Sequence, residues 1–226
     1  MKTSTYQSLL PHLKTGDLVL FSGKYSISKL VEKLEHSMWS HVGMVVRPDP
    51  AGEVYFFEST ALTNLEDVYF HDHKTGPKVV KLIDRLNTYG KDLDPYEPPQ
   101  YALRSINLEG ENIDEEQLFV YMQKVHGIPN PSQWKMIEEV IEGRFFHITS
   151  QSNDYTCSKL IAETYQTLGL FFPDMPLNGY MPADFSSPGR VKLTGAKLGE
   201  EVLIELEQGD VSITSESSSA PFKVRD

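Results

Sequence analysis

The 226-residue sequence has only one cysteine, Cys157, so no internal disulfide can form. A single thiol also excludes a zinc knuckle built from two closely spaced cysteines. Reactivity is then the main function that remains for a cysteine in this chain. An unpaired cysteine is typical of a reducing compartment, and we therefore expect a cytoplasmic protein.

Long apolar segments and an excess of positive charge are missing as well. No apolar run approaches the ~20 residues that a membrane-spanning helix needs, and the first residues lack the hydrophobic segment of a signal peptide. The formal net charge is −11. Because nucleic acids are bound by basic surfaces that neutralise phosphates, we expect no nucleic-acid partner. The same charge disfavours docking on anionic lipid.

The length and the ordinary composition indicate one domain over residues 1–207, followed by a Ser- and Glu-rich tail, 208–226, that we expect to be disordered. Hydrophobic periodicity, turn residues and capping residues predict the secondary structure of the domain. The expected strands are 16–21, 39–47, 54–60, 78–83, 101–107 and one or two within 191–205, and the expected helices are 26–36, 84–89, 114–126, 133–142 and 155–168. This order predicts an α+β fold with a mostly antiparallel sheet.

Cys157 falls at the start of the most clearly predicted helix, 155–168. A helix N-terminus favours a thiolate, because its unpaired N–H groups and the helix dipole stabilise negative charge. The same N–H groups can hold the oxyanion that forms when a thiolate attacks a carbonyl carbon. The position favours a nucleophile, although a lone cysteine on the apolar face of a helix is also typical of a small core residue.

His41 is the best candidate for the base that such a nucleophile needs. Turn-forming residues at 48–52 predict a β-hairpin between the strand that holds His41 and the strand that holds Glu58. With the turn centred between Asp49 and Pro50, His41 lies directly opposite Glu58, with their Cβ atoms about 5 Å apart. Glu58 can then accept the imidazole N–H and fix the tautomer. A slip of one residue would place the two side chains on opposite faces of the sheet.

The other histidines have no comparable setting. His71 and His73 are spaced like a metal-binding pair, but no cysteine or suitably spaced acidic residue supports them. We expect neither a metal nor another cofactor. A histidine within a strand and a glutamate at a strand end also have ordinary structural roles, so these residues taken singly leave the function open.

Four segments taken in order resemble the permuted NlpC/P60-like papain-fold proteins, the group that includes the YiiX-like hydrolases. The segments are GDLVLF at 16–21, SMWSHVGM at 37–44, FES at 57–59 and YTCSKLIA at 155–162. Residues 182–185 also look like the PADF element of that family, and the resemblance extends over 16–191. It implies a circularly permuted papain-like α+β fold, in which the sheet packs against the helix that carries the cysteine.

The resemblance implies a cysteine hydrolase without a cofactor. Carried over to this sequence, it makes Cys157 the nucleophile, His41 the base and Glu58 the residue that orients His41, and it points to a small peptide or amide substrate. The candidates for substrate binding flank these positions and are Tyr155, Trp39 and Ser40.

The sequence departs from the family pattern at two places. Lys159 stands where the family has a glutamate after Cys-Ser, which adds a positive charge near the nucleophile. Residues 127–151 read GIPNP and then a further helical stretch, where relatives have a short GKPY-like turn. We expect this segment to shape the substrate cleft.

Two other functions remain open at this point. The lecithin:retinol acyltransferases have a related permuted fold and pass an acyl group through a cysteine, so a lipid ester is an alternative substrate, for a thioesterase or an acyltransferase. Their NCEHF-type segment and membrane-anchoring helix are absent here. The third alternative is a non-catalytic binding or structural protein that keeps an inert thiol.

Overall fold

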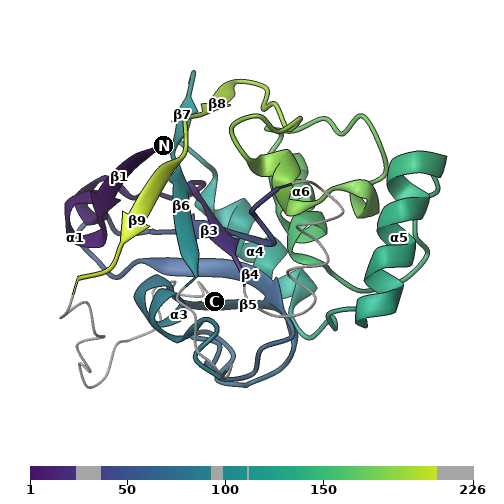
Figure 1. Ribbon diagram of the computed structural model, residues 1–226, viewed down its shortest axis with the longest axis horizontal. Helices are drawn as coiled ribbons and strands as arrows, with labels where there is room; N and C mark the ends of the chain where they lie inside the picture. Colours follow the sequence, from purple (N-terminus) through teal and green to yellow (C-terminus); the bar gives the residue numbers. More distant parts are fainter. Residues whose placement is uncertain (24–36, 93–98, 111, 208–226) are drawn as a thin grey trace.

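A seven-stranded sheet forms the centre of the computed structural model, which describes residues 1–23, 37–92, 99–110 and 112–207 (Figure 1). In spatial order its strands are β1 (Lys2–Thr5), β9 (Val202–Glu205), β6 (Gln100–Arg104), β2 (Leu18–Ser22), β3 (His41–Val46), β4 (Tyr55–Thr60) and β5 (Gly76–Lys81). Only β1 and β9 pair in parallel among these described strands, and every other neighbouring pair is antiparallel. A small second sheet joins β7 (Ile106–Leu108) to β8 (Ala196–Leu198). The predicted α+β class and the mostly antiparallel sheet are confirmed.

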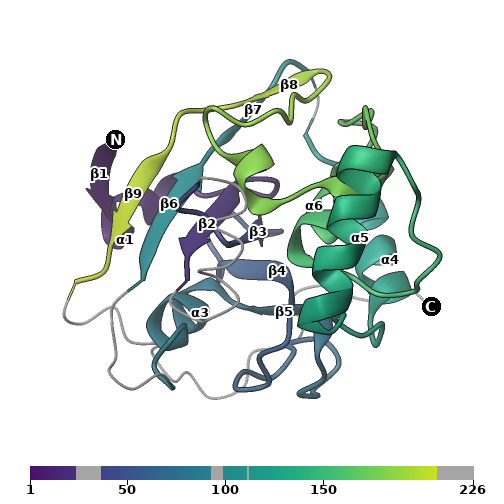
Figure 2. The same cartoon turned by 45° about the vertical axis from the view of Figure 1, so that its right-hand side comes forward.

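Helices cover both faces of the central sheet. They are α1 (Tyr6–Leu9), α3 (Leu82–Thr88), α4 (Glu115–Val125), α5 (Gln133–Phe146) and α6 (Cys157–Thr167). Successive strand residues point to opposite faces, so Leu20 and Val42 pack in the same apolar cluster as α4 and α6. Phe21 and Val45 pack in the other cluster, with α3. Helix α5 lies outside α6, at the right-hand edge of the molecule in Figure 1 and in front of α6 in Figure 2.

Helix α6 begins two residues later and ends one residue earlier than the predicted 155–168. The Thr156 hydroxyl accepts the Lys159 N–H at 3.2 Å and caps its N-terminus. Gly169 follows the helix with a φ of +71°, the left-handed conformation that commonly ends helices. The Tyr165 hydroxyl donates to the carbonyl of Gly16 at 2.7 Å, which ties α6 to the start of β2.

The Gly16–Asp17 pair has a structural role in this fold. Gly16 has a φ of +94°, and a Cβ at this position would lie 2.2 Å from the Ile113 side chain. The buried carboxylate of Asp17 accepts the backbone N–H groups of Ile106 at 2.8 Å and Lys14 at 3.0 Å. Burial raises the pKa of Asp17 to about 6, against the lowering effect of these two hydrogen bonds. The pair therefore fixes how β2 starts beside β7.

Several predicted elements differ from the structure in extent. The strand predicted over 101–107 is two strands, β6 and β7, which belong to different sheets. The helix predicted over 133–142 continues to Phe146, and strand β1 was not predicted at all. The helix predicted over 26–36 and the tail 208–226 lie outside the described residues. No helix within the described ranges has the length and apolar character needed to cross a membrane.

The register of the β3–β4 hairpin corrects one prediction. The strands pair Met44 with Phe57, and this register, continued along them, places Gly43 opposite Glu58. The prediction that His41 lies directly opposite Glu58 is therefore wrong by two positions. An even shift leaves every side chain on its own face of the sheet, so His41 and Glu58 become diagonal neighbours that remain within reach of each other.

The register shifts because the turn is centred between Pro50 and Ala51, one residue later than predicted. Gly43 makes the diagonal arrangement possible. A Cβ there would lie 2.2 Å from the nearest atom of the Phe56 ring, so the ring occupies the place of the missing side chain. The hairpin prediction itself is confirmed.

Candidate active site

His41 and Glu58 form a short, buried hydrogen bond. The Glu58 carboxylate accepts from Nε2 of His41 at 2.6 Å, and the two residues are 7% and 0% exposed. The imidazole stacks on Tyr89 at a centroid distance of 5.9 Å and meets the ring of Phe21 edge-on at 5.3 Å. These contacts fix the ring, and the bond to Glu58 leaves Nδ1 as the nitrogen available to another partner.

That partner is Cys157, the first residue of α6. Its Sγ lies 3.8 Å from the hydroxyl of Ser158, and the pKa of the thiol responds to hydrogen bonding from the His41 side chain and from the backbone N–H of Val42. Burial by itself raises the pKa of the Cys157 thiol, but the charge of His41 and these hydrogen bonds outweigh it, so the pKa lies below its ordinary value. The structure thus brings together Cys157, His41 and Glu58, the three residues that we predicted from the sequence as a catalytic set.

The pKa of His41 shifts in the opposite direction. Burial lowers it, but the negative charge and hydrogen bond of Cys157, followed by those of Glu58, raise it to about 9. A lowered thiol pKa beside a raised imidazole pKa is the signature of a thiolate–imidazolium pair at neutral pH.

Arg85 of α3 is a residue that the sequence analysis missed. It is fully buried, and both Nε and one terminal nitrogen lie 2.5 Å from Oε1 of Glu58, while the other carboxylate oxygen faces His41. Burial raises the pKa of Glu58, but the charge of Arg85 and then His41 outweigh it, so that pKa stays below its ordinary range. Glu58 is therefore ionised despite its burial. The available signal was the position of Arg85 on the same helical face as Leu82 and Leu86, which are apolar.

Lys78 adds a second buried cation to this group. It stands opposite Glu58 in the β4–β5 pairing and is 2% exposed. Its ammonium donates to the carbonyl of Leu65 at 3.2 Å. Burial lowers the pKa of Lys78, and the charge of Glu58 opposes that shift.

The start of α6 supplies backbone donors beside the thiol. Thr156 caps the N–H of Lys159, and the N–H of Leu160 is bonded to the carbonyl of Thr156. The N–H groups of Cys157 and Ser158 come before the first helical hydrogen bond. This is the arrangement needed to stabilise an oxyanion next to Cys157.

A cleft with a volume of about 190 Å³ opens beside Cys157. One wall is α5, which contributes mostly apolar side chains. The rest of the lining comes from the start of α6, from Ser40 and from residues 180–182. The α5 residues that line it are Met136, Ile137, Val140, Ile141, Arg144 and Phe145. Helix α5 belongs to the segment 127–151, so this segment does line the cleft beside Cys157, while its role toward a substrate stays a prediction.

The three predicted substrate-binding residues lie in different places. Ser40 lines the cleft. Trp39 is 2% exposed, bonds Glu201 through its indole N–H at 3.2 Å and lines a neighbouring pocket. Tyr155 packs below Lys159 and donates to Glu163 at 2.9 Å. Neither Trp39 nor Tyr155 lines the described cleft, because each faces the core with its ring.

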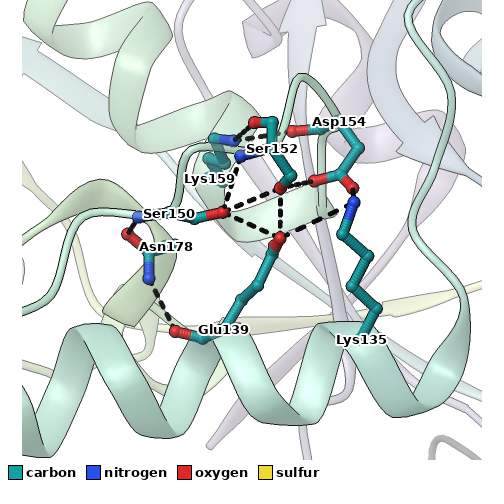
Figure 3. A network of polar contacts seen from close by, with 7 residues as sticks. All are labelled: Lys135, Glu139, Ser150, Ser152, Asp154, Lys159 and Asn178. Atoms are coloured by element: carbon teal, nitrogen blue, oxygen red, sulfur yellow. Dashed lines mark hydrogen bonds and ion pairs between the residues drawn. The ribbon is translucent and has the colours of Figure 1, made fainter.

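A polar network fixes α5 to the segment that leads into Cys157 (Figure 3). Glu139 of α5 accepts from the hydroxyls of Ser150 and Ser152, and the Ser152 hydroxyl also contacts Asp154 at 2.9 Å. Figure 3 shows these side chains converging between the helix and the loop. The network holds the cleft wall in a set position relative to the nucleophile.

Two lysines and an asparagine complete that network. Lys135 lies 2.5 Å from the carboxylate of Asp154, and Lys159 donates to the Asp154 carbonyl at 2.7 Å. Asn178 donates to the carbonyl of Glu139 at 2.6 Å. Lys159, the residue that differs from the pattern of the resembled family, thus points its ammonium group to the loop before Cys157 and stabilises that loop.

The His71–His73 segment has other partners. His71 contacts the carboxylate of Glu66 at 3.1 Å, and His73 contacts the carbonyl of Thr63 at 2.9 Å. Within the described ranges, no group of three or more His, Cys, Asp or Glu residues is arranged to hold a metal ion.

No protein-family model matches this sequence, and no curated protein does. Among solved structures, the chain is similar to the crystal structure of the metalloprotein yiiX from Escherichia coli O157:H7, at 21% identity and a TM-score of 0.44. The match covers 69% of this chain and 66% of that one, which is less than two thirds of its length. At this identity and TM-score, neither the activity nor the metal of that protein transfers to this chain.

Proposed function

We propose that this protein is a thiol hydrolase that cleaves an amide or peptide bond through Cys157, His41 and Glu58. The observation that carries the proposal is the buried hydrogen-bonded chain of His41, Glu58 and Arg85, with opposite pKa shifts at Cys157 and His41. If Cys157 were a purely structural residue, burial would raise the pKa of its thiol.

In the proposed acylation, the Cys157 thiolate attacks the carbonyl carbon and forms a tetrahedral intermediate. The N–H groups at the start of α6 stabilise its oxyanion. The C–N bond then breaks, and the His41 imidazolium gives its proton to the departing amine. The products are a thioester on Cys157 and a neutral imidazole.

Water completes the turnover. Neutral His41 takes a proton from water as the oxygen attacks the thioester carbon, and the C–S bond breaks to release the carboxylic acid product and the thiolate. His41 is then an imidazolium again. Glu58 remains ionised throughout and stabilises the positive charge on His41.

Alkylation by iodoacetamide tests the ion pair directly. We expect wild-type Cys157 to be labelled rapidly at pH 6–7, where an ordinary thiol with a pKa near ~8.5 is mostly protonated. In His41→Ala the labelling rate at that pH should fall by at least ~10-fold and recover only above pH ~8. Cys157→Ala is the control for labelling elsewhere, because the sequence has no other cysteine.

The same measurement separates the non-catalytic alternative. Labelling that appears only above pH ~8 and does not depend on His41 would contradict the hydrolase and favour a binding or structural protein. If the ion pair is present, release of amine from an acyl p-nitroanilide should stop in both His41→Ala and Cys157→Ala.

A further inference from the structure

A second pocket, with a volume of about 530 Å³, adjoins the cleft beside Cys157. We call it the Trp39 pocket. Residues 37–39, residues within 183–190 and Glu201, which directly precedes β9, line it, and it shares Arg144 with the cleft. A pocket of this volume accommodates a small molecule. The reaction proposed at Cys157 uses none of its side chains.

Three of the four charged side chains that line the Trp39 pocket have an opposite charge beside them. Arg144 donates to Asp184 at 2.8 Å, and Arg190 donates to Asp174 at 3.1 Å. Glu201 is the exception, because no ion pair joins it to a cation within the described ranges. The pocket therefore contains one carboxylate without a cation in contact.

The Glu201 carboxylate is held in place through one of its two oxygens. Oε1 accepts the indole N–H of Trp39 at 3.2 Å and the backbone N–H of Ser187 at 2.8 Å. Glu201 is 8% exposed, yet Oε2 accepts no hydrogen bond from the described part of the chain. It is also not sealed from solvent, unlike the unpartnered Oε2 of Glu139. A carboxylate oxygen only accepts hydrogen bonds, so a ligand on Oε2 must bring a donor.

Arg104 does not supply that donor. Burial lowers the pKa of Arg104 and the charge of Glu201 opposes that shift, so the two charges interact. The guanidinium nevertheless donates to four backbone carbonyls, at 2.6–3.1 Å, and these belong to Phe185, Ser186, Leu198 and Gly199. Arg104 thus stabilises the backbone behind Glu201 and leaves Oε2 open to the pocket.

We propose that the Trp39 pocket binds the cationic group of a small molecule, a primary ammonium or a guanidinium, on Oε2 of Glu201. This site goes beyond the proposed hydrolase function and does not rest on it. Hydrogen bonds between a cation and a carboxylate are about twice as strong as those between neutral groups, and an anion would be repelled by Glu201. The net charge of −11 also attracts cations to the protein.

A fluorescence titration with agmatine, which carries both cationic groups, tests the site. The chain has two tryptophans, so Trp134→Phe, at a position that is 81% exposed, leaves Trp39 as the reporter beside Glu201. We expect agmatine and butylamine to change the Trp39 emission in a saturable way. The response to 1-butanol, which has nearly the shape of butylamine without its charge, should be at least ~10-fold weaker.

Glu201→Gln, made in the same background, removes the charge and keeps the shape. The glutamine carbonyl can still accept from Trp39 and Ser187, while its amide group puts a donor in the place of Oε2. We expect agmatine to bind at least ~10-fold more weakly. Glu200→Gln is the matched control, because it removes the same charge from the adjacent, exposed residue, which does not line the pocket. Its affinity for agmatine should stay within about twofold.

The cation can belong to a separate small molecule or to one end of the molecule that Cys157 cleaves, and hydrolysis separates these two sources. Acetyl-lysine p-nitroanilide and acetyl-norleucine p-nitroanilide differ chiefly in the terminal ammonium group. A preference of at least ~10-fold in kcat/KM for the lysine substrate that is lost in Glu201→Gln assigns the cation to the substrate. Equal kcat/KM, with agmatine binding intact, assigns it to a separate ligand.

Three results would overturn the cation site. They are equal binding of butylamine and 1-butanol, equal binding of agmatine by Glu201→Gln and Glu200→Gln, and unchanged Trp39 emission up to ~10 mM agmatine. Thermal unfolding checks that the variants fold, and the comparison of butylamine with 1-butanol decides the question without Glu201→Gln. None of these results depends on the reactivity of Cys157, so the hydrolase is tested separately.

Discussion

The two sides of Cys157 are built in opposite ways. On one side, His41, Glu58 and Arg85 are 7%, 0% and 0% exposed, and they form a chain of charges closed off from water. On the other side, the α5 wall is apolar and partly open, with Phe145 70% exposed. Proton transfer needs charges held in a dry and fixed geometry. The apolar side chains of α5, in contrast, remain partly accessible to solvent.

The difference also separates the energetic roles of the two regions. A buried carboxylate that loses its cation leaves an uncompensated charge, so the acid–base side is sensitive to any single change. Half-exposed side chains on α5 lose little burial when they are replaced. We therefore expect stability and catalysis to be coupled on the first side and largely independent on the second.

The largest expected effect comes from Arg85→Met. It removes the guanidinium that lies 2.5 Å from Glu58 in a fully buried pair, and we expect the free energy of unfolding to fall by ~3–5 kcal/mol. Urea denaturation measures this change. Arg190→Met is the matched control, because Arg190 and Asp174 form an ion pair at the surface, where the expected loss is below ~1 kcal/mol. Equal losses in the two variants would refute the role given to burial.

Glu58→Gln should change the pH dependence of the reaction. Turnover needs the thiolate and the imidazolium together, so kcat/KM in the wild type should rise with pH through the lowered pKa of Cys157 and fall again near pH 9, where His41 loses its proton. The carboxylate raises the pKa of His41, and its loss should move the alkaline limb to lower pH. We also expect kcat/KM at pH 7 to fall by ~10²-fold.

The measurement is a pH–rate profile for both proteins with one substrate. The two limbs describe the coupled Cys157–His41 pair and not either residue alone. An alkaline limb at the same pH in Glu58→Gln would mean that Glu58 does not act through His41. Refolding of the variant to the wild-type circular dichroism spectrum serves as the control.

Gly143→Ala tests the fixed position of α5. The added Cβ would lie 2.5 Å from the Gly179 backbone, and we expect a loss of ~1–3 kcal/mol in stability as the helix is pushed outward. Alkylation of Cys157 by iodoacetamide should not change. Gly110→Ala is the control, since no atom lies within 4 Å of a Cβ there. A rigid wall is excluded if Gly143→Ala is as stable as that control.

The smallest expected effect is that of Lys135→Met. The Lys135 side chain is 44% exposed and pairs with Asp154 at 2.5 Å, while the Ser152 hydroxyl remains as a second partner of that carboxylate. We expect urea denaturation to show a smaller loss of stability than in the other variants, because water screens an exposed ion pair. A much larger loss would mean that the network of Figure 3 depends on this lysine more than its exposure indicates.

Local patterns were sufficient for much of the fold. The apolar spacing predicted α6 to within two residues of its start at Cys157. Helix α4 begins after Asp114, which caps the Gln117 N–H. Such features depend on residues within one or two turns of each other. The end of α5 could not be predicted from its sequence pattern. The residue that ends the helix, His147, has a left-handed backbone conformation, and a glycine would be the usual signal for that conformation.

The residues that meet at the candidate site could be predicted, but the strand register and the orientation of the neighbouring side chains could not. The alternation of β3 and β4 placed His41 and Glu58 on one face whichever even register formed, so their contact was correctly expected although the pairing was two positions away. The roles of Trp39 and Tyr155 were not predictable. Both neighbour the proposed catalytic residues in sequence, but their side chains are buried in the core.

By itself, the sequence determined the fold class, the helix that presents Cys157 and the face shared by His41 and Glu58, because each depends on periodicity and on local hydrogen bonds. The permuted papain-like topology, the substrate and the cytoplasmic location stay predictions. Only the tertiary structure decided that Arg85 neutralises Glu58 and that α5 lines the cleft. These contacts join segments far apart in the chain, and their geometry follows from the packing of the whole core.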